Sequence, residues 1–179
     1  MLFYYIIIVL SLLIILAALI VLFFILWSFV TLISTKVPFA PTPKKTINLA
    51  LKEAEVKAGQ VVYDLGCGDG RVLLAAEKFG AKTVGFELSL SNYLKTKFKI
   101  WLTGSKSKIY RKNFLKQNLS DADIIFCFLV GKVMPKVKEK LKNNLKPGTK
   151  IISYAFAFPS WQPYKILETK PSKTYFYKL

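Results

Sequence analysis

Histidine is absent from the 179 residues, and cysteine occurs only twice, as Cys67 and Cys127. The lack of histidine excludes metal sites built on imidazole and general bases of the histidine type. Two cysteines do not suggest the disulfide framework of a small secreted domain. We therefore expect reduced thiols, no metal ion and no histidine-based catalysis.

Charge is absent from the first 35 residues, since no acidic or basic side chain precedes Lys36. The stretch from Leu2 to Ile33 is almost purely aliphatic and aromatic, and it exceeds the roughly 20 apolar residues that span a bilayer. A core helix is rarely apolar on all sides over such a length, and a signal peptide begins with a basic region that is missing here. We expect a retained transmembrane helix. Lys36, Lys44 and Lys45 follow it, which predicts a single-pass protein with the remaining chain on the cytoplasmic side.

Acidic residues are scarce: the chain has 10 Asp and Glu against 27 Lys and Arg, a formal net charge of +17. Such a surplus favours contact with an anionic surface. It is also compatible with a solvated lysine-rich face or with nucleic acid. Anionic lipid needs the fewest assumptions beside a membrane anchor, because each lysine near headgroups contributes about 1 kcal/mol. We expect an anionic membrane surface as partner, with nucleic acid as the less favoured alternative.

Prolines at positions 38, 41 and 43 separate the apolar helix from the remaining sequence. Proline fixes φ and lacks an amide donor, so this stretch should be an extended lead-in. A helix with Ile47, Leu51 and Ala54 on one face should follow and stop at Gly59. The expected organisation is an anchor over residues 1–35, a lead-in with one helix over 36–58, and one compact domain over 59–179.

Short apolar runs alternate with amphipathic helical stretches from Val61 onward. This order predicts an α/β fold with a Rossmann-like, mostly parallel sheet, covered on both faces and finished by an antiparallel C-terminal hairpin. The expected strands are 61–65, 83–87, 108–111, 122–129 and 150–156, the hairpin strands are 164–168 and 174–178, and the expected helices are 70–79, 89–102 and 132–145.

The segment Asp64-Leu-Gly-Cys-Gly-Asp-Gly70 joins the first expected strand to a helix. Its three glycines permit positive φ and close approach of a ligand to the backbone. A dinucleotide fingerprint would need a small residue where Arg71 stands, and a P-loop would need Lys-Ser/Thr after the last glycine. The carboxylates of Asp64 and Asp69 disfavour a pyrophosphate but suit a ligand with a sulfonium and an ammonium, such as S-adenosylmethionine.

Glu87 stands at the end of the second expected strand, where a carboxylate can bind two ribose hydroxyls. Together with D-x-G-x-G-x-G after the first strand, it resembles motif I and post-I of class I S-adenosylmethionine-dependent methyltransferases. The resemblance covers nearly everything after the anchor, but the helix usual between strands five and six is replaced by Ala157-Phe-Pro-Ser-Trp161. It implies S-adenosylmethionine as cofactor, bound by Asp64, Gly66, Cys67, Gly68, Gly70 and Glu87.

Three segments further resemble the small protein-lysine methyltransferases typified by the ATP synthase c-subunit lysine methyltransferase and its archaeal relatives. They are Pro38–Pro43, the glycine loop and Ser153–Trp161. This resemblance implies a membrane-anchored enzyme that methylates lysine side chains of a protein. By position it implies that Asn113 accepts from the adenine amino group with Phe114 beside it, and that Thr42 touches the cofactor. An acidic residue is usual at position 113, so the amide implies a weaker contact.

Aromatic side chains are the candidates for a substrate channel, since we identify no catalytic base. Aromatic faces attract a cation and exclude water, and partial desolvation promotes proton loss from a lysine acceptor. Core packing is the competing fate of each ring. Asp121 and Asp123 are the acids that we expect to offset repulsion between a lysine acceptor and the basic domain. The candidate channel residues are Phe39, Phe128, Tyr154, Phe158 and Trp161.

Two other classes of function stay open. The end of the fourth strand, Phe126-Cys-Phe-Leu-Val-Gly131, lacks the Asn/Asp-Pro-Pro-aromatic motif of adenine amino-methylating enzymes and the Pro-Cys pair of cytosine C5 enzymes. A methyltransferase acting on RNA, lipid or a small molecule is the alternative among enzymes, and an inactive cofactor-binding scaffold is the alternative outside them. Cys127 is expected to be a buried small side chain rather than a nucleophile.

Overall fold

The computed structural model describes residues 1–34 and 41–179 and divides the chain into two compact units, Met1–Pro38 and Phe39–Leu179. The first unit contains a single helix, α1 (Leu2–Ser34). Its stretch Phe3–Trp27 is strongly apolar and carries no charged side chain, and its most apolar part is not buried within the structure. These 25 residues rise about 37 Å at 1.5 Å per residue, more than the roughly 30 Å of a bilayer core. By length and composition α1 is therefore a candidate membrane span, a test that an N-terminal signal sequence also meets.

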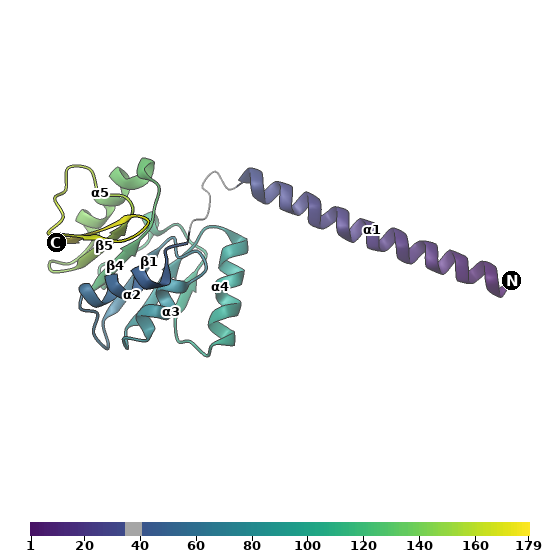
Figure 1. The fold of residues 1–179 in the computed structure, drawn as a ribbon, viewed down its shortest axis with the longest axis horizontal. Helices are drawn as coiled ribbons and strands as arrows, with labels where there is room; N and C mark the ends of the chain where they lie inside the picture. Colours follow the sequence, from purple (N-terminus) through teal and green to yellow (C-terminus); the bar gives the residue numbers. More distant parts are fainter. Residues whose placement is uncertain (35–40) are drawn as a thin grey trace. The chain divides into compact units, whose positions relative to one another are not determined.

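The second unit is built on a seven-stranded sheet of order β3-β2-β1-β4-β5-β7-β6 (Figure 1). β7 pairs antiparallel with β5 and β6, and the other neighbours are parallel. This confirms the expected Rossmann-like, mostly parallel sheet with a closing hairpin. The strands are β1 (Val61–Leu65), β2 (Lys82–Phe86), β3 (Lys108–Tyr110), β4 (Ile124–Cys127), β5 (Lys150–Tyr154), β6 (Lys165–Glu168) and β7 (Lys173–Lys178).

Helices cover both faces of the sheet, with α2 and α3 on one side and α5 on the other (Figure 1). Alternation along β4 divides the core, because successive side chains point to opposite faces. Ile124 and Phe126 pack in the cluster that α2 and α3 join, whereas Ile125 and Cys127 pack in the cluster that α5 joins. The helices are α2 (Lys44–Glu53), α3 (Arg71–Glu77), α4 (Leu90–Leu102) and α5 (Met134–Asn144), with 3-10 turns η1 (Phe114–Lys116) and η2 (Gly131–Val133).

Several elements end earlier than the sequence pattern predicts, for local backbone reasons. β5 stops at Tyr154 instead of residue 156 because Ala155 has φ +67°, outside the range of a strand. The helix expected up to Gly59 ends at Glu53, shortly before Glu55, with φ +54°. The chain after β4 first makes η2, and α5 then starts with a proline in its first turn, where the missing amide costs nothing.

Gly85 of β2 allows the glycine loop and α3 to approach the sheet closely. A Cβ at this position would lie 2.8 Å from Cys67 Sγ and 2.7 Å from Leu73 Cδ1. Both side chains are buried, so neither can move aside freely. The absence of a side chain at Gly85 thus fixes how near the loop after β1 lies to β2.

Gly85→Ala should lower the free energy of unfolding by about 1–3 kcal/mol, because it overpacks this contact. The measurement is thermal unfolding of the full chain in detergent. Gly131→Ala is the matched control, since a Cβ there would meet only Phe156, with Cδ1 at 3.6 Å, an ordinary contact. Equal unfolding temperatures for both variants would contradict the close approach.

Candidate functional site

The candidate site lies where the parallel strands end. In the sheet register Leu65 is opposite both Phe86 and Cys127, so the last residues of β1, β2 and β4 meet at one edge. The glycine loop follows β1 and Glu87 follows β2 directly. The carboxyl edge of an open parallel sheet is the usual place for a ligand crevice.

The glycine loop is held by hydrogen bonds to the end of β2 and by one bond within the loop. The amides of Gly66 and Cys67 both donate to Phe86 O, at 2.9 and 3.0 Å, and Gly70 N donates to Cys67 O at 2.8 Å. Gly68 N donates to Glu87 Oε2 at 2.9 Å. Positive φ values of 82°, 52° and 72° at the three glycines make these bonds possible. Because these amides are all engaged, they do not form the open anion cradle of a P-loop.

Thr96 of α4 holds the loop from the opposite side. Its hydroxyl donates to Gly68 O at 2.6 Å, and its side chain is 1% exposed. A Cβ at Gly70 would lie 2.5 Å from Thr96 Cγ2, so this glycine is needed for space as well as for φ. Thr96 is not among the residues expected from the sequence. The only signal for it was a small polar residue on the inner face of an amphipathic helix.

Asp64, the last but one residue of β1, is buried without a counterion. It is 3% exposed, and among residues 1–34 and 41–179 no side chain or amide donates to its carboxylate and no cation pairs with it. Burial raises the pKa of Asp64 well above its ordinary value, and the negative charges of Glu87 and Asp69 raise it further. A buried carboxylate in this state is stabilised by a cationic ligand.

Asp69 differs from the expectation that it is a second free carboxylate for a cation. Arg71 binds it with two guanidinium hydrogen bonds of 2.8 Å, and Lys99 Nζ lies 3.7 Å away. Burial alone would raise the pKa of Asp69, but the Arg71 and Lys99 interactions lower it overall. Its charge is therefore balanced within the protein, and the free carboxylate of the loop is Asp64.

Thr42 lies beside this loop, because Arg71 Nη1 donates to its carbonyl at 2.9 Å. Thr42 is thus linked to the glycine loop through Arg71, which also binds Asp69, and the Thr42 side chain is buried. Cys67 is buried as well; its amide donates to Phe86 O of β2, and its carbonyl accepts from Gly70 N. Its thiol packs near Gly85, so Cys67 shapes the loop.

Asn113 and Phe114 follow β3, at the same edge of the sheet. The Asn113 side-chain oxygen accepts from Leu115 N at 3.0 Å and caps η1. Phe114 packs against the core cluster on the α5 side. The amide at position 113 therefore has a structural partner, while one lone pair of its oxygen remains for a ligand.

The candidate channel aromatics divide between the two faces of the sheet. Phe128 and Tyr154 pack edge to face with centroids 4.9 Å apart, and Phe128 stacks on Phe156 at 6.4 Å. Phe156 is 37% exposed and was missed by the sequence analysis, which stopped at its neighbours. Ser153 Oγ donates to Phe156 O at 2.5 Å and fixes the turn that presents the ring.

Phe158 and Trp161 do not join that group, which corrects the single channel expected from the sequence. Their rings are 5.4 Å apart and each lies 5.1 Å from Tyr177, in the cluster on the α5 face. The physical reason is the turn at Ala155, after which the chain crosses to the other face. Phe39, the fifth candidate, lies outside the described residues.

Asp121 and Asp123 also lie elsewhere than expected. They precede β4, at the amino edge of the sheet, so they are not beside the glycine loop. Asp121 accepts from Tyr63 Oη at 2.9 Å, and Asp123 pairs with Lys146 at 2.7 Å. Cys127 is buried as expected, and burial raises the pKa of its thiol to about 12, which keeps it protonated.

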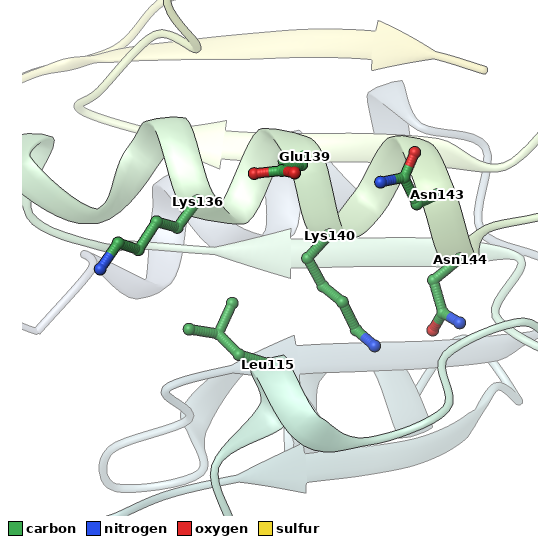
Figure 2. A pocket seen from close by; sticks show the side chains of 6 residues that line it. All are labelled: Leu115, Lys136, Glu139, Lys140, Asn143 and Asn144. Carbon is green, nitrogen blue, oxygen red and sulfur yellow. The ribbon is translucent and has the colours of Figure 1, made fainter.

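A surface hollow of about 330 Å³ lies between η1 and α5 (Figure 2). Lysine and amide side chains of α5 and the single apolar side chain of Leu115 line it. None of the candidate site residues contributes to this hollow, so it is separate from the glycine loop. Its lining residues are Leu115, Lys136, Glu139, Lys140, Asn143 and Asn144.

Known proteins similar to this chain include protein-lysine methyltransferases. A protein-lysine N-methyltransferase of Saccharolobus islandicus is 36% identical over 75% of this chain and 86% of its own length. The human ATP synthase c-subunit lysine N-methyltransferase is 32% identical over 75% of this chain and 59% of its own length. The chain thus spans most of the archaeal relative and little more than half of the human one.

A solved structure with the same fold carries the cofactor product. It is an RNA methyltransferase from Salinibacter ruber in complex with S-adenosyl-L-homocysteine, with a TM-score of 0.75, 28% identity, and coverage of 78% of this chain and 93% of that one. Residues 64–165 match the family model of the ANTKMT methyltransferase domain, from the glycine loop into β6. The chain belongs to the ANTKMT methyltransferase-domain family, whose cofactor is S-adenosylmethionine.

Proposed function

We propose that this chain is a membrane-anchored protein-lysine methyltransferase. A lysine side chain as methyl acceptor is supported mainly by one observation: this chain is 36% identical to an archaeal protein-lysine N-methyltransferase over 86% of that protein's length. The unpaired, buried carboxylate of Asp64 beside the closed glycine loop supports the binding of a cationic methyl donor at the sheet edge.

The residues at this edge fit S-adenosylmethionine. In this proposal Asp64 neutralises the ammonium, and Glu87, held by the amides of Gly68 and Ser89, binds the ribose hydroxyls. Asn113 and Phe114 flank the adenine, and Thr42 touches the cofactor. A side chain at Gly66 would reach Leu129 Cδ2 at 3.2 Å and narrow the space beside the loop.

The cofactor, when bound, would supply a sulfonium methyl group: an amine nitrogen would bond to the methyl carbon while the carbon–sulfur bond breaks, and a neutral thioether would leave. The protein then needs to align a neutral lysine amine, which is mainly a matter of proximity and orientation. Phe128 and Phe156 form an apolar aromatic surface near the ends of β4 and β5, and the buried ring of Tyr154 packs against Phe128. Such a surface attracts the ammonium and, by excluding water, lowers the pKa of the acceptor so that its proton passes to solvent.

The membrane part of the proposal rests on α1 and on charge. Phe3–Trp27 has the length and composition of a span, and Lys36, Lys44 and Lys45 follow it. By the positive-inside rule the methyltransferase domain lies on the cytoplasmic side. The +17 charge supports an anionic membrane surface as its surroundings.

RNA is the acceptor class of the main alternative. The match to the RNA methyltransferase structure from Salinibacter ruber covers 93% of that protein's chain. The surplus of lysine suits a polyanion as well as a membrane. Lipid, a small molecule and a scaffold without catalysis are the remaining alternatives.

Asp64→Asn should weaken S-adenosylmethionine binding about tenfold or more, because it removes a charge-assisted contact. It should also stabilise the protein without ligand at neutral pH. Because the pKa of Asp64 is raised in the folded protein, its contribution to the free energy of unfolding is fully present below the ordinary Asp pKa and is lost as the pH rises through the raised pKa. Asn does not ionise, so the variant does not suffer this loss of stability. Calorimetry and thermal unfolding of the full chain in detergent measure both effects.

Asp123→Asn is the matched control. Burial alone would raise the pKa of Asp123, but its hydrogen bonds with Lys146 and Val61 N lower it overall. Its contribution is therefore present at neutral pH and lost as pH falls through the lowered pKa. This variant should be less stable than wild type and bind the cofactor normally. Parallel behaviour of the two variants would contradict the distinct role of Asp64.

Phe156→Leu should raise the KM for a lysine acceptor several-fold and leave cofactor binding unchanged, because leucine keeps the apolar contact but lacks the aromatic face. The measurement is methyl transfer at varied acceptor concentration with the full chain in detergent. Tyr164→Leu removes another exposed ring, 54% exposed before β6, and should change neither quantity. Equal KM values for Phe156→Leu and wild type would exclude Phe156 from acceptor binding.

Methyl-labelled S-adenosylmethionine identifies the acceptor directly. The full chain, in detergent, is incubated with separated protein, RNA and lipid fractions of a host-cell membrane preparation. We expect label as methyl-lysine after hydrolysis of the protein fraction, and much less with Asp64→Asn. Label only in RNA or lipid would overturn the lysine proposal. Cofactor binding without transfer to any fraction would favour the scaffold.

A further inference from the structure

Helix α4 carries an apolar stripe on its solvent side. At 100° per residue, Leu90, Leu94, Phe98, Trp101 and Leu102 fall within a sector about 120° wide. Phe98 is 60% exposed, Trp101 74% and Leu102 67%. Their opposite, inner side holds Thr96, the one buried residue of the helix. The amphipathic pattern of α4 is therefore inverted, with its largest apolar side chains in solvent.

Scattered apolar side chains are normal on a protein surface, but this stripe is continuous. Phe98 and Trp101 touch each other, with ring centroids 5.7 Å apart. Leu88, two residues before the helix, is exposed as well. Contiguous apolar surface rimmed by polar residues marks an interaction site.

The rim of the stripe is basic. Lys95 and Lys97 follow its two borders on the helix surface. The stretch from Leu88 to Ser120 contains Lys and Arg residues but no Asp or Glu. The matching partner therefore presents apolar groups beneath a layer of negative charge.

We propose that the outer face of α4 docks onto an anionic lipid bilayer, with Leu94, Phe98 and Trp101 inserted below the headgroups. An amphipathic helix with Trp, Phe and Leu between lysines suits the membrane interface. A second copy of the chain fits poorly, because a two-fold contact would bring lysines against lysines. The proposal rests on the proposed membrane anchoring, since insertion of α1 brings the domain of the same chain to the bilayer.

The chain's three tryptophans provide the test, because Trp27 lies in α1, Trp101 in the stripe, and Trp161 against Phe158 and Tyr177. Three full-length variants each keep one tryptophan and carry Phe at the other two positions. They are reconstituted into vesicles of phosphatidylcholine, with or without phosphatidylserine, that contain acyl-brominated lipid. Bromine quenches tryptophan only at lipid contact.

We expect quenching of Trp27 in both vesicles, quenching and a blue shift of Trp101 that strengthen with phosphatidylserine, and neither for Trp161. Quenched Trp27 with unquenched Trp101 would overturn the docking inference alone. Unquenched Trp27 would overturn the anchoring on which it rests. Self-association that shields Trp101 from lipid, measured by crosslinking, would assign the stripe to a second copy and also overturn it.

Charge variants separate the stripe from the general basicity of the domain. Lys95→Glu with Lys97→Glu should abolish the phosphatidylserine dependence of Trp101 quenching. Lys136→Glu with Lys140→Glu is the control, because it changes the net charge by the same amount on α5, beside the hollow of Figure 2. The exposed residues of α5 include no large apolar side chain. The α5 pair should leave Trp101 quenching unchanged. Equal loss in both double variants would contradict a docking surface on α4.

Discussion

Gly68 is held from two sides, and the geometry of the site depends on this. Its amide donates to Glu87 at the end of β2, while its carbonyl accepts from Thr96 of α4. The loop is thus fixed between a strand and a helix before any ligand arrives. The backbone amides of the glycine loop already have acceptors, so the polar groups left for a ligand are carboxylates. Among the residues described, Asp64 is the carboxylate of the site without a partner inside the protein. In the proposed function a cationic cofactor completes this arrangement.

The sheet and the loop could be predicted from sequence because they depend on local patterns. Strand order follows from alternating strand and helix signals, and the three positive φ values follow from the three glycines. Thr96 and Gly85 could not be found this way. Thr96 contacts Gly68, 28 residues away in the sequence, and Gly85 contacts Cys67, 18 residues away. Local sequence patterns do not reveal contacts between residues so far apart.

The aromatic residues show a second limit of sequence reasoning. Composition and proximity in the chain grouped Phe158 and Trp161 with Tyr154, but the turn at Ala155 sends them to the opposite face of the sheet. The same turn leaves Phe156 exposed beside Phe128. This turn, where Ala155 has positive φ, thus separates the rings that pack beside Phe128 from those that pack in the core on the α5 face. Alanine gives no signal for this conformation, as glycine would have done.

Charge links the proposed acceptor to the proposed location. A chain with +17 net charge repels a lysine acceptor, and the acids expected to relieve this repulsion lie at the amino edge of the sheet, where Asp123 pairs with Lys146. An anionic bilayer would supply the missing negative charge from outside the protein. In that setting α4 would contact lipid with its outer face while Thr96, on its inner face, holds Gly68. Lipid docking would then screen the repulsion and orient the cofactor loop through one helix.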